Sequence, residues 1–556
     1  MEEWKSGRCS NYLPTPLLLH SSTLMNSLSG VLFQSSRQIV QRSYNEMNVG
    51  DWIRKRAVLS SEKTALIFEE KEFTYRQVNE RTNQLAHAMI DRGIKKGDRV
   101  AALFHNCHQF LEVYFAAAKL GAIFVPLNFR LAGPELEYML NDCRTEMLIY
   151  NHDFTETVDS IRSAIPVKKG NFIQVGGDTS RWALDYEGLL LQYPMSEPEV
   201  KEDVGLEDPQ MIMYTSGTTG QPKGALLSHK KTFYNTFNAD IYFDISSTDR
   251  MLVVMPLFHS GGLNITAVPI LYKGGTAIIQ KHFDPEEVLR LIERYKITLM
   301  MAVPTMLNFI MKKTEIEKYD LSSLKTCMTA GEACPLSLIK EYQRRNIPIR
   351  QVFGQTETSI VLWLSEEDSI RKAGSVGLPV FHSDVRVVNK KGKDVVPGEI
   401  GEIIVKGPIQ MIGYWNLPQE TQQTMRDGWL YTGDLARVDD EGYVYIVDRE
   451  RDMFISGGEN VYPAEIEKVY ATHPKILESA VIGVPDDKWG EVGNAIIALK
   501  EGQPMTEKDA IDFCKGKLAK YKIPKSVFFV DELPKTASGK IKKGPLREKY
   551  GKRPLN

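Results

Sequence analysis

Short apolar runs and longer amphipathic stretches alternate along the first two thirds of the chain. Residues 100–104 form an apolar run, 110–120 carry a helical pattern that Gly121 ends, and 122–125 are apolar again. This spacing predicts a strand, a helix and a second strand, which is the βαβ unit of a parallel sheet. The same alternation returns at 251–256, 277–279, 285–295, 299–303 and 325–329. We therefore expect an α/β fold whose large N-terminal domain consists of layered α/β subdomains.

The pattern changes after about residue 375. Residues 384–388 and 399–405 alternate between apolar and polar, and the pairs Lys391-Gly392 and Pro397-Gly398 mark turns. Antiparallel hairpins are expected there, in a small β-barrel-like subdomain. Beyond Asp448-Arg449 the pattern predicts a small α+β domain with helices at 463–472 and 506–517 and strands at 478–484 and 495–499.

Three parts are thus expected: a leader of residues 1–46, a large domain of residues 47–448 and a small, mobile C-terminal domain of residues 449–556. The leader is rich in Ser and contains Arg8, Arg37 and Arg42. A transit peptide would share these features, but Glu2 and Glu3 argue against one. A disordered leader and a start codon placed too early both stay open.

Composition excludes several classes of partner. The 556 residues are 42% hydrophobic and 25% charged with a net charge of −2, which gives no reason to expect nucleic acid as a partner. No apolar run is long enough for a transmembrane helix, although peripheral membrane contact and a homodimer stay open. Six cysteines lack metal-ligand spacing and favour a reducing, cytoplasmic location; they are Cys9, Cys107, Cys143, Cys327, Cys334 and Cys514.

The polar stretch 214–224 (YTSGTTGQPKG) follows the apolar run 211–213 and cannot bury a hydrophobic face. Its glycines let the backbone approach a ligand, and its hydroxyls, peptide N–H groups and Lys223 suit an anion. We interpret it as a phosphate-binding loop, with a flexible linker as the alternative. It is not the common P-loop, because Gly224 stands where Ser or Thr would follow the lysine.

Five stretches together resemble one family. They are 215–224, 353–357 (FGQTE), 431–434 (YTGD), 455–463 (ISGGENVYP) and 535–540 (KTASGK). In this order they are similar to the motifs of the AMP-forming acyl-CoA synthetases, which belong to the adenylate-forming superfamily together with firefly luciferase, the 4-coumarate–CoA ligases and the adenylation domains of peptide synthetases. The resemblance covers about residues 50–550. It implies that a carboxylic acid and ATP form an acyl-adenylate and pyrophosphate, and that coenzyme A then takes the acyl group and releases AMP.

The resemblance also implies a site for ATP and Mg²⁺. Thr356 would contact the α-phosphate, and Thr215 and Glu357 would help to place Mg²⁺, which prefers oxygen ligands. The β- and γ-phosphates would be held by Thr215, Ser216, Gly217, Thr218, Thr219, Gly220 and Lys223. Adenine would lie between Phe353-Gly354, where the family usually has Tyr in place of Phe, and the stretch Gly331, Glu332 and Ala333. Asp434 and Arg449 would bind the ribose.

The residues that the resemblance assigns to the acid and to CoA come from the middle and the C-terminal part of the chain. Lys540 would bridge the carboxylate and the α-phosphate in the transition state, a role for which a flexible ammonium is suited. His259 would line the acyl pocket near the reacting carboxylate. For the thioester step the small domain would rotate at 448–451 and present Gly457 and Gly458 to the pantetheine arm of CoA.

Three substrate classes fit this chemistry. A medium- or long-chain fatty acid is favoured, because the small residues Thr329, Ala330 and Gly331 leave room beside the apolar positions Tyr234, Phe237, Phe258, Val303 and Val361. An aryl acid of the 4-coumarate type is the alternative. An amino acid loaded onto a carrier protein is disfavoured, because residues 256–263 contain no carboxylate to pair with an ammonium. A non-catalytic nucleotide sensor would tolerate the loss of Lys540 or Glu357, yet both are present.

Overall fold

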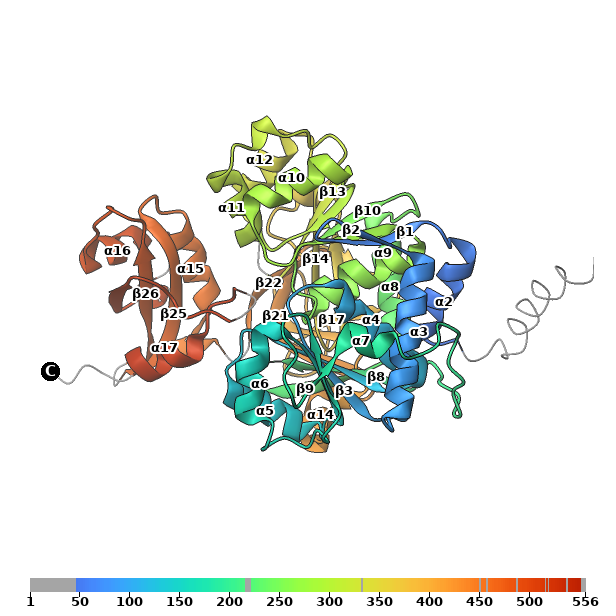
Figure 1. Ribbon diagram of the computed structural model, residues 1–556. Helices are drawn as coiled ribbons and strands as arrows, with labels where there is room; N and C mark the ends of the chain where they lie inside the picture. The colour runs from blue at the N-terminus through green and yellow to red at the C-terminus, as the bar shows by residue number, and fades with distance from the viewer. Residues whose placement is uncertain are drawn as a thin grey trace, which may run out of the picture. The chain divides into compact units, whose positions relative to one another are not determined.

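The computed structural model describes residues 47–215, 222–331, 334–449, 452–456, 459–486, 489–515, 517–518, 520–536 and 539–551. They form four sheets, with helices on the faces of the larger ones (Figure 1). The expected α/β fold is confirmed. Within these ranges every helix is too short or too polar to cross a lipid bilayer.

Sheet A has nine strands and a parallel centre with antiparallel strands at both edges. Its order is β16 (Leu378–Pro379), β15 (Ser359–Leu364), β14 (Ile349–Gln355), β13 (Thr326–Thr329), β12 (Leu299–Met301), β10 (Arg250–Val253), β11 (Thr276–Ile279), β1 (Thr64–Phe68) and β2 (Lys71–Thr74). The strands β10 and β12 end earlier than the apolar runs predict.

Sheet B has eight strands, parallel except where β9 pairs with β8 and β19. Its order is β19 (Gly413–Tyr414), β9 (Lys223–Ser228), β8 (Pro209–Thr215), β4 (Ile123–Leu127), β3 (Arg99–Leu103), β5 (Met147–Asn151), β6 (Phe172–Val175) and β7 (Leu184–Asp185).

The helices cover both faces of these sheets, and so the strands are apolar on both sides. Along β10, Met251 and Val253 enter the main core while Leu252 enters a second core. The main core contains residues of α2 (Gly50–Leu59), α3 (Tyr75–Asp91), α4 (His108–Leu120), α8 (His229–Phe243) and α9 (Val268–Lys273). The second contains residues of α10 (Pro285–Tyr295), α11 (Pro304–Lys313) and α12 (Leu336–Gln343), which Figure 1 shows together beside β13. Continuous apolar strands are typical of such doubly covered sheets.

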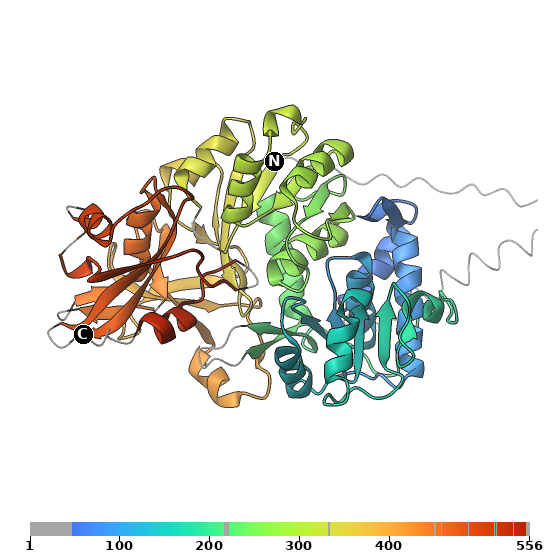
Figure 2. The same ribbon diagram turned by 60° about the vertical axis from the view of Figure 1, so that its left-hand side comes forward.

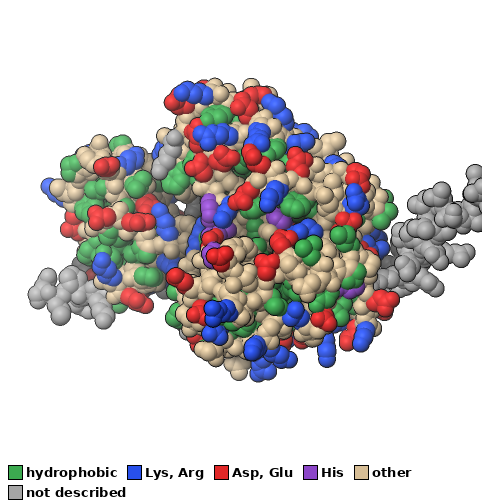
Figure 3. All heavy atoms as spheres, in the orientation of Figure 1, with side chains coloured by type: hydrophobic (Ala, Val, Ile, Leu, Met, Phe, Trp, Pro, Cys, Tyr) green, Lys and Arg blue, Asp and Glu red, His purple; other side chains and the backbone are tan. Residues whose placement is uncertain are grey.

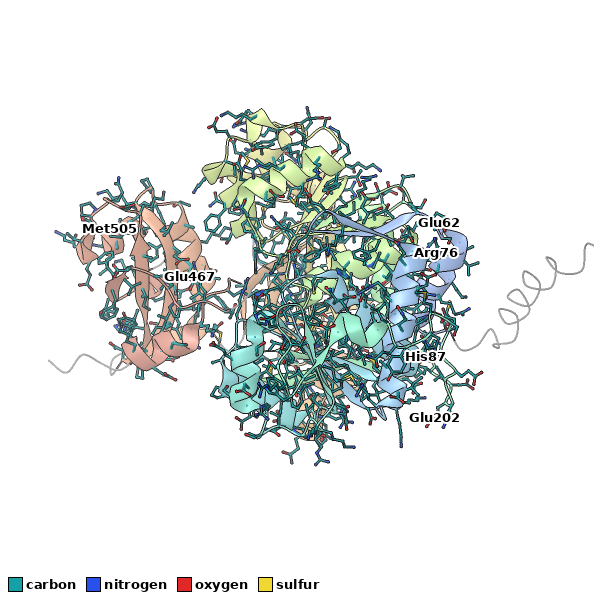
Figure 4. All side chains as sticks on the ribbon, in the orientation of Figure 1. Glu62, Arg76, His87, Glu202, Glu467 and Met505 are labelled. Atoms are coloured by element: carbon teal, nitrogen blue, oxygen red, sulfur yellow. The ribbon has the colours of Figure 1, made fainter. Side chains whose placement is uncertain are left out.

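The remaining helices of this part are short. On sheet B, α5 (Gly133–Asp142) and α6 (Thr155–Ile161) cover the outer core, and α7 (Tyr186–Leu190) follows β7. Single turns and short segments complete the set: η1 (His152–Phe154), the π-helix η2 (Gly261–Ala267), η3 (Ile316–Lys318), α13 (Asp368–Arg371) and α14 (Pro418–Thr424). At the start of α3, Arg76 Nε donates to Glu62 Oε1 at 2.9 Å, and the two side chains are labelled in Figure 4.

Sheet C is the predicted set of antiparallel hairpins, curled into a half-barrel. It contains β17 (Asp384–Val388), β18 (Ile400–Lys406), β20 (Met425–Arg426), β21 (Trp429–Val438) and β22 (Val444–Arg449). Figure 2 shows this part from a second direction.

Sheet D forms the C-terminal α+β part with β23 (Phe454–Ser456), β24 (Glu459–Val461), β25 (Ile476–Asp486), β26 (Gly490–Leu499) and β27 (Ser526–Val530). Its helices are α15 (Pro463–Ala471), α16 (Glu507–Cys514), the turn η4 (Lys520–Lys522) and α17 (Lys543–Tyr550). The helix predicted at 506–517 is too long, because Lys515 adopts extended backbone angles and bridges to Leu518. Lysine, arginine and carboxylate side chains are interspersed on the face in Figure 3, as the small net charge predicts.

Candidate active site

The turn between β14 and β15 carries the two residues assigned to the α-phosphate and Mg²⁺. Thr356 and Glu357 lie where Gln355 pairs with Ser359, and the Gln355 N–H donates to Thr358 Oγ1 at 3.1 Å. A Cβ on Gly354 would stand 1.7 Å from the Ser359 carbonyl oxygen, so only glycine fits there. Ser359 itself has a φ of +59°. The hairpin is therefore closed tightly, which fixes the backbone at its tip.

Glu357 joins three segments that are distant in the sequence. Its Oε1 accepts hydrogen bonds from Thr215 Oγ1 at 3.3 Å and from Tyr414 Oη at 3.0 Å. Its carbonyl oxygen accepts from the Met411 N–H at 2.8 Å. Thr215 ends β8 of sheet B, whereas Glu357 extends from sheet A. The predicted pair is thus brought together where the two sheets meet.

This oxygen-rich position fits a hard cation only in part. Thr215 and Glu357 offer a hydroxyl and a carboxylate, which are ligands that Mg²⁺ accepts. Across the described ranges no three His, Cys, Asp or Glu side chains gather into a metal site. Mg²⁺ is commonly held by one or two protein oxygens together with phosphate oxygens and water. The residues present therefore suit a metal that arrives with a nucleotide.

Tyr414 is a site residue that the sequence reasoning missed. Besides its bond to Glu357, its ring lies 5.5 Å from Lys223 Nζ, the lysine of the predicted phosphate loop. Its only signal in the sequence is an aromatic residue after the glycine of a short strand, which is too common to indicate a site. The adjoining loop residues Ser216, Gly217, Thr218, Thr219 and Gly220 lie outside the described residues, and their assignment stays a prediction.

Two buried polar side chains lie two residues before Gly331 and Phe353, which the resemblance assigns to adenine. Thr329 and Gln351 are opposite each other in the register of β13 and β14. Both are buried, and Thr329 Oγ1 and Gln351 Nε2 have no hydrogen-bond partner among the described residues. Unpaired buried groups are costly, and a purine offers both donors and acceptors. These two unpaired atoms suit adenine. Gln351 is a polar residue inside an apolar strand, a signal that could have been noticed in the sequence.

The other adenine residues are described in part. Phe353 is half-buried on β14, two residues after Gln351, and Gly331 follows β13 with a φ of +88°. That left-handed angle favours glycine. Glu332 and Ala333 lie outside the described residues.

Asp434, which the resemblance assigns to the ribose, lies on β21. Its side chain is buried and accepts a hydrogen bond from Gln355 Nε2. The Asp434 N–H donates to Thr432 Oγ1 at 3.1 Å, which fixes the turn before it. Arg449 is its partner in the β21–β22 register, although the Arg449 side chain lies outside the described part. The hairpin of Thr356 and the half-barrel of Asp434 therefore meet through Gln355.

Lys540 and His259 come close to the same place. Lys540 Cε lies 3.9 Å from where a Cβ on Gly331 would stand. The Gly261 N–H donates to His259 Nδ1 at 3.2 Å, so a neutral ring carries its proton on Nε2. Burial, and then the charge of Lys540, lower the pKa of His259 to about 4. His259 is thus a neutral donor at physiological pH.

Some predicted residues cannot be placed. Gly457, Gly458 and the hinge residue Arg451 lie outside the described residues. Of the predicted pocket walls, Phe258 packs edge-on against Phe129 at 5.3 Å between ring centroids, and Val361 belongs to the core beneath sheet C.

Comparisons with known proteins show which family the chain resembles over most of its length. Residues 53–415 match the family described as AMP-binding enzyme, and residues 465–540 match the AMP-binding enzyme C-terminal domain. A feruloyl-CoA synthase of Amycolatopsis sp. is 40% identical over 90% of this chain and 99% of its own. An indoleacetate–CoA ligase of Aromatoleum aromaticum is 39% identical, and a long-chain-fatty-acid–CoA ligase of Mycobacterium tuberculosis is 38% identical, each over 90% of this chain and 98% of its own.

Solved structures show the same fold. An anthranilate–CoA ligase in complex with anthranoyl-AMP superposes with a TM-score of 0.84 at 31% identity, over 91% of this chain and 98% of the other. An o-succinylbenzoate–CoA synthetase of Bacillus subtilis with ATP and magnesium superposes with a TM-score of 0.79 at 32% identity, over 88% and 98% of the two chains.

Proposed function

This chain belongs to the AMP-binding enzymes and is an AMP-forming acid–thiol ligase, and from that premise we propose that its acid is an aryl or arylalkanoic acid. The reaction uses ATP, Mg²⁺ and CoA and passes through an acyl-adenylate. A carboxylate oxygen bonds to the α-phosphorus while the bond to the pyrophosphate oxygen breaks. The thiol of CoA then displaces AMP from the acyl carbon.

Lys540 lies close to Gly331 and His259, and this supports a role for Lys540 in adenylate formation, the first step. An ammonium there can neutralise charge shared by the carboxylate and the α-phosphate as the new bond forms. Thr356 and Glu357 lie in one fixed turn, which would orient the phosphate and the metal without motion during the reaction. Bound Mg²⁺ would supply additional positive charge to the phosphates. His259, neutral and protonated on Nε2, can donate one hydrogen bond to an oxygen of the acid.

A buried amide after His259 supports an acid with a polar ring substituent. Asn264 lies on η2, three per cent exposed, and its Oδ1 has no partner among the described residues. An aromatic acid whose ring reached this oxygen would satisfy it with a hydroxyl or an N–H, whereas a hydrocarbon tail there would leave it unpaired. The feruloyl, indoleacetate and anthranilate relatives act on such acids by name. A long-chain fatty acid is the second candidate, which the Mycobacterium tuberculosis relative favours.

Pyrophosphate release over a panel of acids tests the proposal. Ferulic, cinnamic, benzoic, anthranilic and indoleacetic acids are compared with fatty acids from hexanoate to palmitate, and the thioester products are identified by mass spectrometry. The aryl acids should give the higher kcat/KM, and Asn264→Leu should shift preference from ferulic toward cinnamic acid. Palmitate as the best substrate, with no effect of Asn264→Leu on the ring series, would show that the enzyme is a fatty-acid ligase.

The division into domains is part of the same proposal. Residues 1–46 are a leader, residues 47–448 the adenylate-forming domain, and residues 449–556 a mobile domain that turns at 448–451. Gly457 and Gly458 would then line the path of pantetheine. Arg451→Pro should slow thioester formation more than pyrophosphate exchange, and an unchanged ratio of the two rates would contradict the hinge.

A further inference from the structure

A second lysine lies buried beneath the turn that carries Thr356 and Glu357. Lys231 is one per cent exposed and is the third residue of α8, where its N–H donates to the N-cap Ser228 Oγ at 3.1 Å. Its Nζ donates to Ser359 Oγ, the residue that closes the turn. No described carboxylate lies within 4.0 Å of that Nζ, so the ammonium has no ion pair among the described residues.

This placement is unfavourable in three ways. A buried ammonium loses its hydration, and a single hydroxyl satisfies only one of its three donors. The positive charge also lies at the N-terminal end of α8, where the helix dipole disfavours cations. Desolvation lowers the pKa of Lys231 to about 7, although the charge of Glu357 acts in the opposite direction.

Lys119 shows how this fold satisfies another buried lysine. It is six per cent exposed on α4. Its Nζ donates to Asn79 Oδ1 at 2.8 Å, to Asn83 Oδ1 at 2.7 Å and to Glu197 Oε2 at 2.6 Å. All three donors are used and one partner is a carboxylate. Among the described residues, Lys231 has one acceptor for its three donors and no carboxylate partner. This indicates that a bound ligand completes its surroundings.

The position of Lys231 beside the turn indicates that the missing partner is an anion. Ser359 has a left-handed φ of +59° and follows the phosphate-assigned turn directly. One turn along α8, Asn235 Oδ1 accepts from the Ile360 N–H at 3.3 Å. Helix α8 thus holds the start of β15 through two side chains, and only one of them is charged. The Glu357 carboxylate on the turn supplies part of the countercharge without forming an ion pair, and an anion that binds at the turn would add to it.

We infer that Lys231 is a positioning residue for adenylate formation, which fixes the turn of Thr356 and Glu357 and whose charge the phosphates of bound ATP balance. The inference rests on the proposed assignment of that turn to the nucleotide. Lys231 need not contact a phosphate for this role, because it acts through Ser359. Its charge should therefore strengthen the binding of the nucleotide and should not stabilise the unbound protein.

Lys231→Met tests the inference, because methionine retains the length of the side chain without the charge. The unbound variant should melt at the same or a higher temperature than wild type, since a buried charge has been removed. The rise in melting temperature on adding MgATP without acid should fall by at least about half. The kcat/KM of pyrophosphate exchange for MgATP should fall about ten- to a hundredfold, whereas thioester formation from supplied acyl-adenylate should be retained. Ser359→Gly, which suits the positive φ and removes the acceptor, should act in the same direction.

Lys119→Met is the matched control. It should lower the melting temperature of the unbound protein, because Glu197 loses its buried partner, and leave the MgATP-induced shift and the exchange rate unchanged. The inference is overturned if Lys231→Met behaves in this way, or if both it and Ser359→Gly keep the wild-type MgATP shift. If Lys231→Met does not fold, Ser359→Gly alone decides. Failure of the wild type to release pyrophosphate with every acid of the panel would instead refute the proposed function.

Discussion

Removal of one hydroxyl tests whether Tyr414 orients the carboxylate of Glu357. Tyr414→Phe deletes the 3.0 Å hydrogen bond to Glu357 Oε1 and retains the ring beside Lys223. Thr215 still donates to the same oxygen at 3.3 Å, so the carboxylate keeps one donor. The variant therefore loosens Glu357 without emptying its surroundings.

The size of the effect follows from the burial of the pair. A hydrogen bond to a charged group contributes about 1.5–3 kcal/mol, and the lower value applies because Tyr414 is half-exposed while Glu357 is only 8% exposed. About 1.4 kcal/mol corresponds to a factor of ten. We expect the concentration of free Mg²⁺ that gives half-maximal pyrophosphate exchange to rise about tenfold, with the KM for the acid unchanged.

The assay is pyrophosphate exchange at saturating ATP and acid with free Mg²⁺ varied. Tyr193→Phe is the control, because its hydroxyl donates to Asp91 Oδ2 at 2.7 Å in a surface pair remote from the turn. It should leave the Mg²⁺ midpoint at the wild-type value. A Tyr414→Phe enzyme with an unchanged Mg²⁺ midpoint and a raised KM for the acid would refute the assignment of Glu357 to the metal.

Three further predictions concern separate features. Lys540→Ala should abolish most adenylate formation but retain thioester formation from supplied acyl-adenylate; equal losses in both steps would exclude the bridging role. Gly354→Ala should lower both stability and exchange activity, since its Cβ would stand 1.7 Å from the Ser359 carbonyl oxygen; a wild-type melting temperature would show that the turn can relax. Burial lowers the pKa of His229 from 6.5 to about 4. Between these two pH values the unfolded chain binds more protons than the folded protein. The free energy of unfolding should therefore fall as the pH drops from 6.5 toward 4. Denaturant unfolding at several pH values should show a shallower fall for His229→Gln, and an identical slope would contradict the assignment.

The local pattern of apolar and polar residues was sufficient to predict several of the helices and strands. The helix predicted at 285–295 is α10 without change, because Asp284 accepts the Glu287 N–H at 2.8 Å and Pro285 occupies the first turn. The buried strands were visible as apolar runs, since both of their faces are covered by helices. The C-terminal end of α16 was not visible in the sequence, because the hydrophobic pattern continues past the residue where the backbone becomes extended.

Which strands become neighbours was decided only by the tertiary structure. β1, near the start of the chain, pairs with β11, and β10 lies between β11 and β12. This order depends on how the whole chain buries its apolar surface, and no local period encodes it. The contacts of Glu357 with Thr215 and Tyr414, and of Lys231 with Ser359, follow from that order.

The sequence alone determined the fold class and the family, because both depend on short stretches with their own spacing. The tertiary structure alone showed that Tyr414 lies beside Glu357 and Lys223. It also showed that Lys231 and Lys119 have different surroundings. Both lysines lie in helices, and their neighbours in the sequence do not distinguish them. The reason is physical: the free energy of a buried charge depends on which distant side chains surround it, and only the packed fold brings those side chains together.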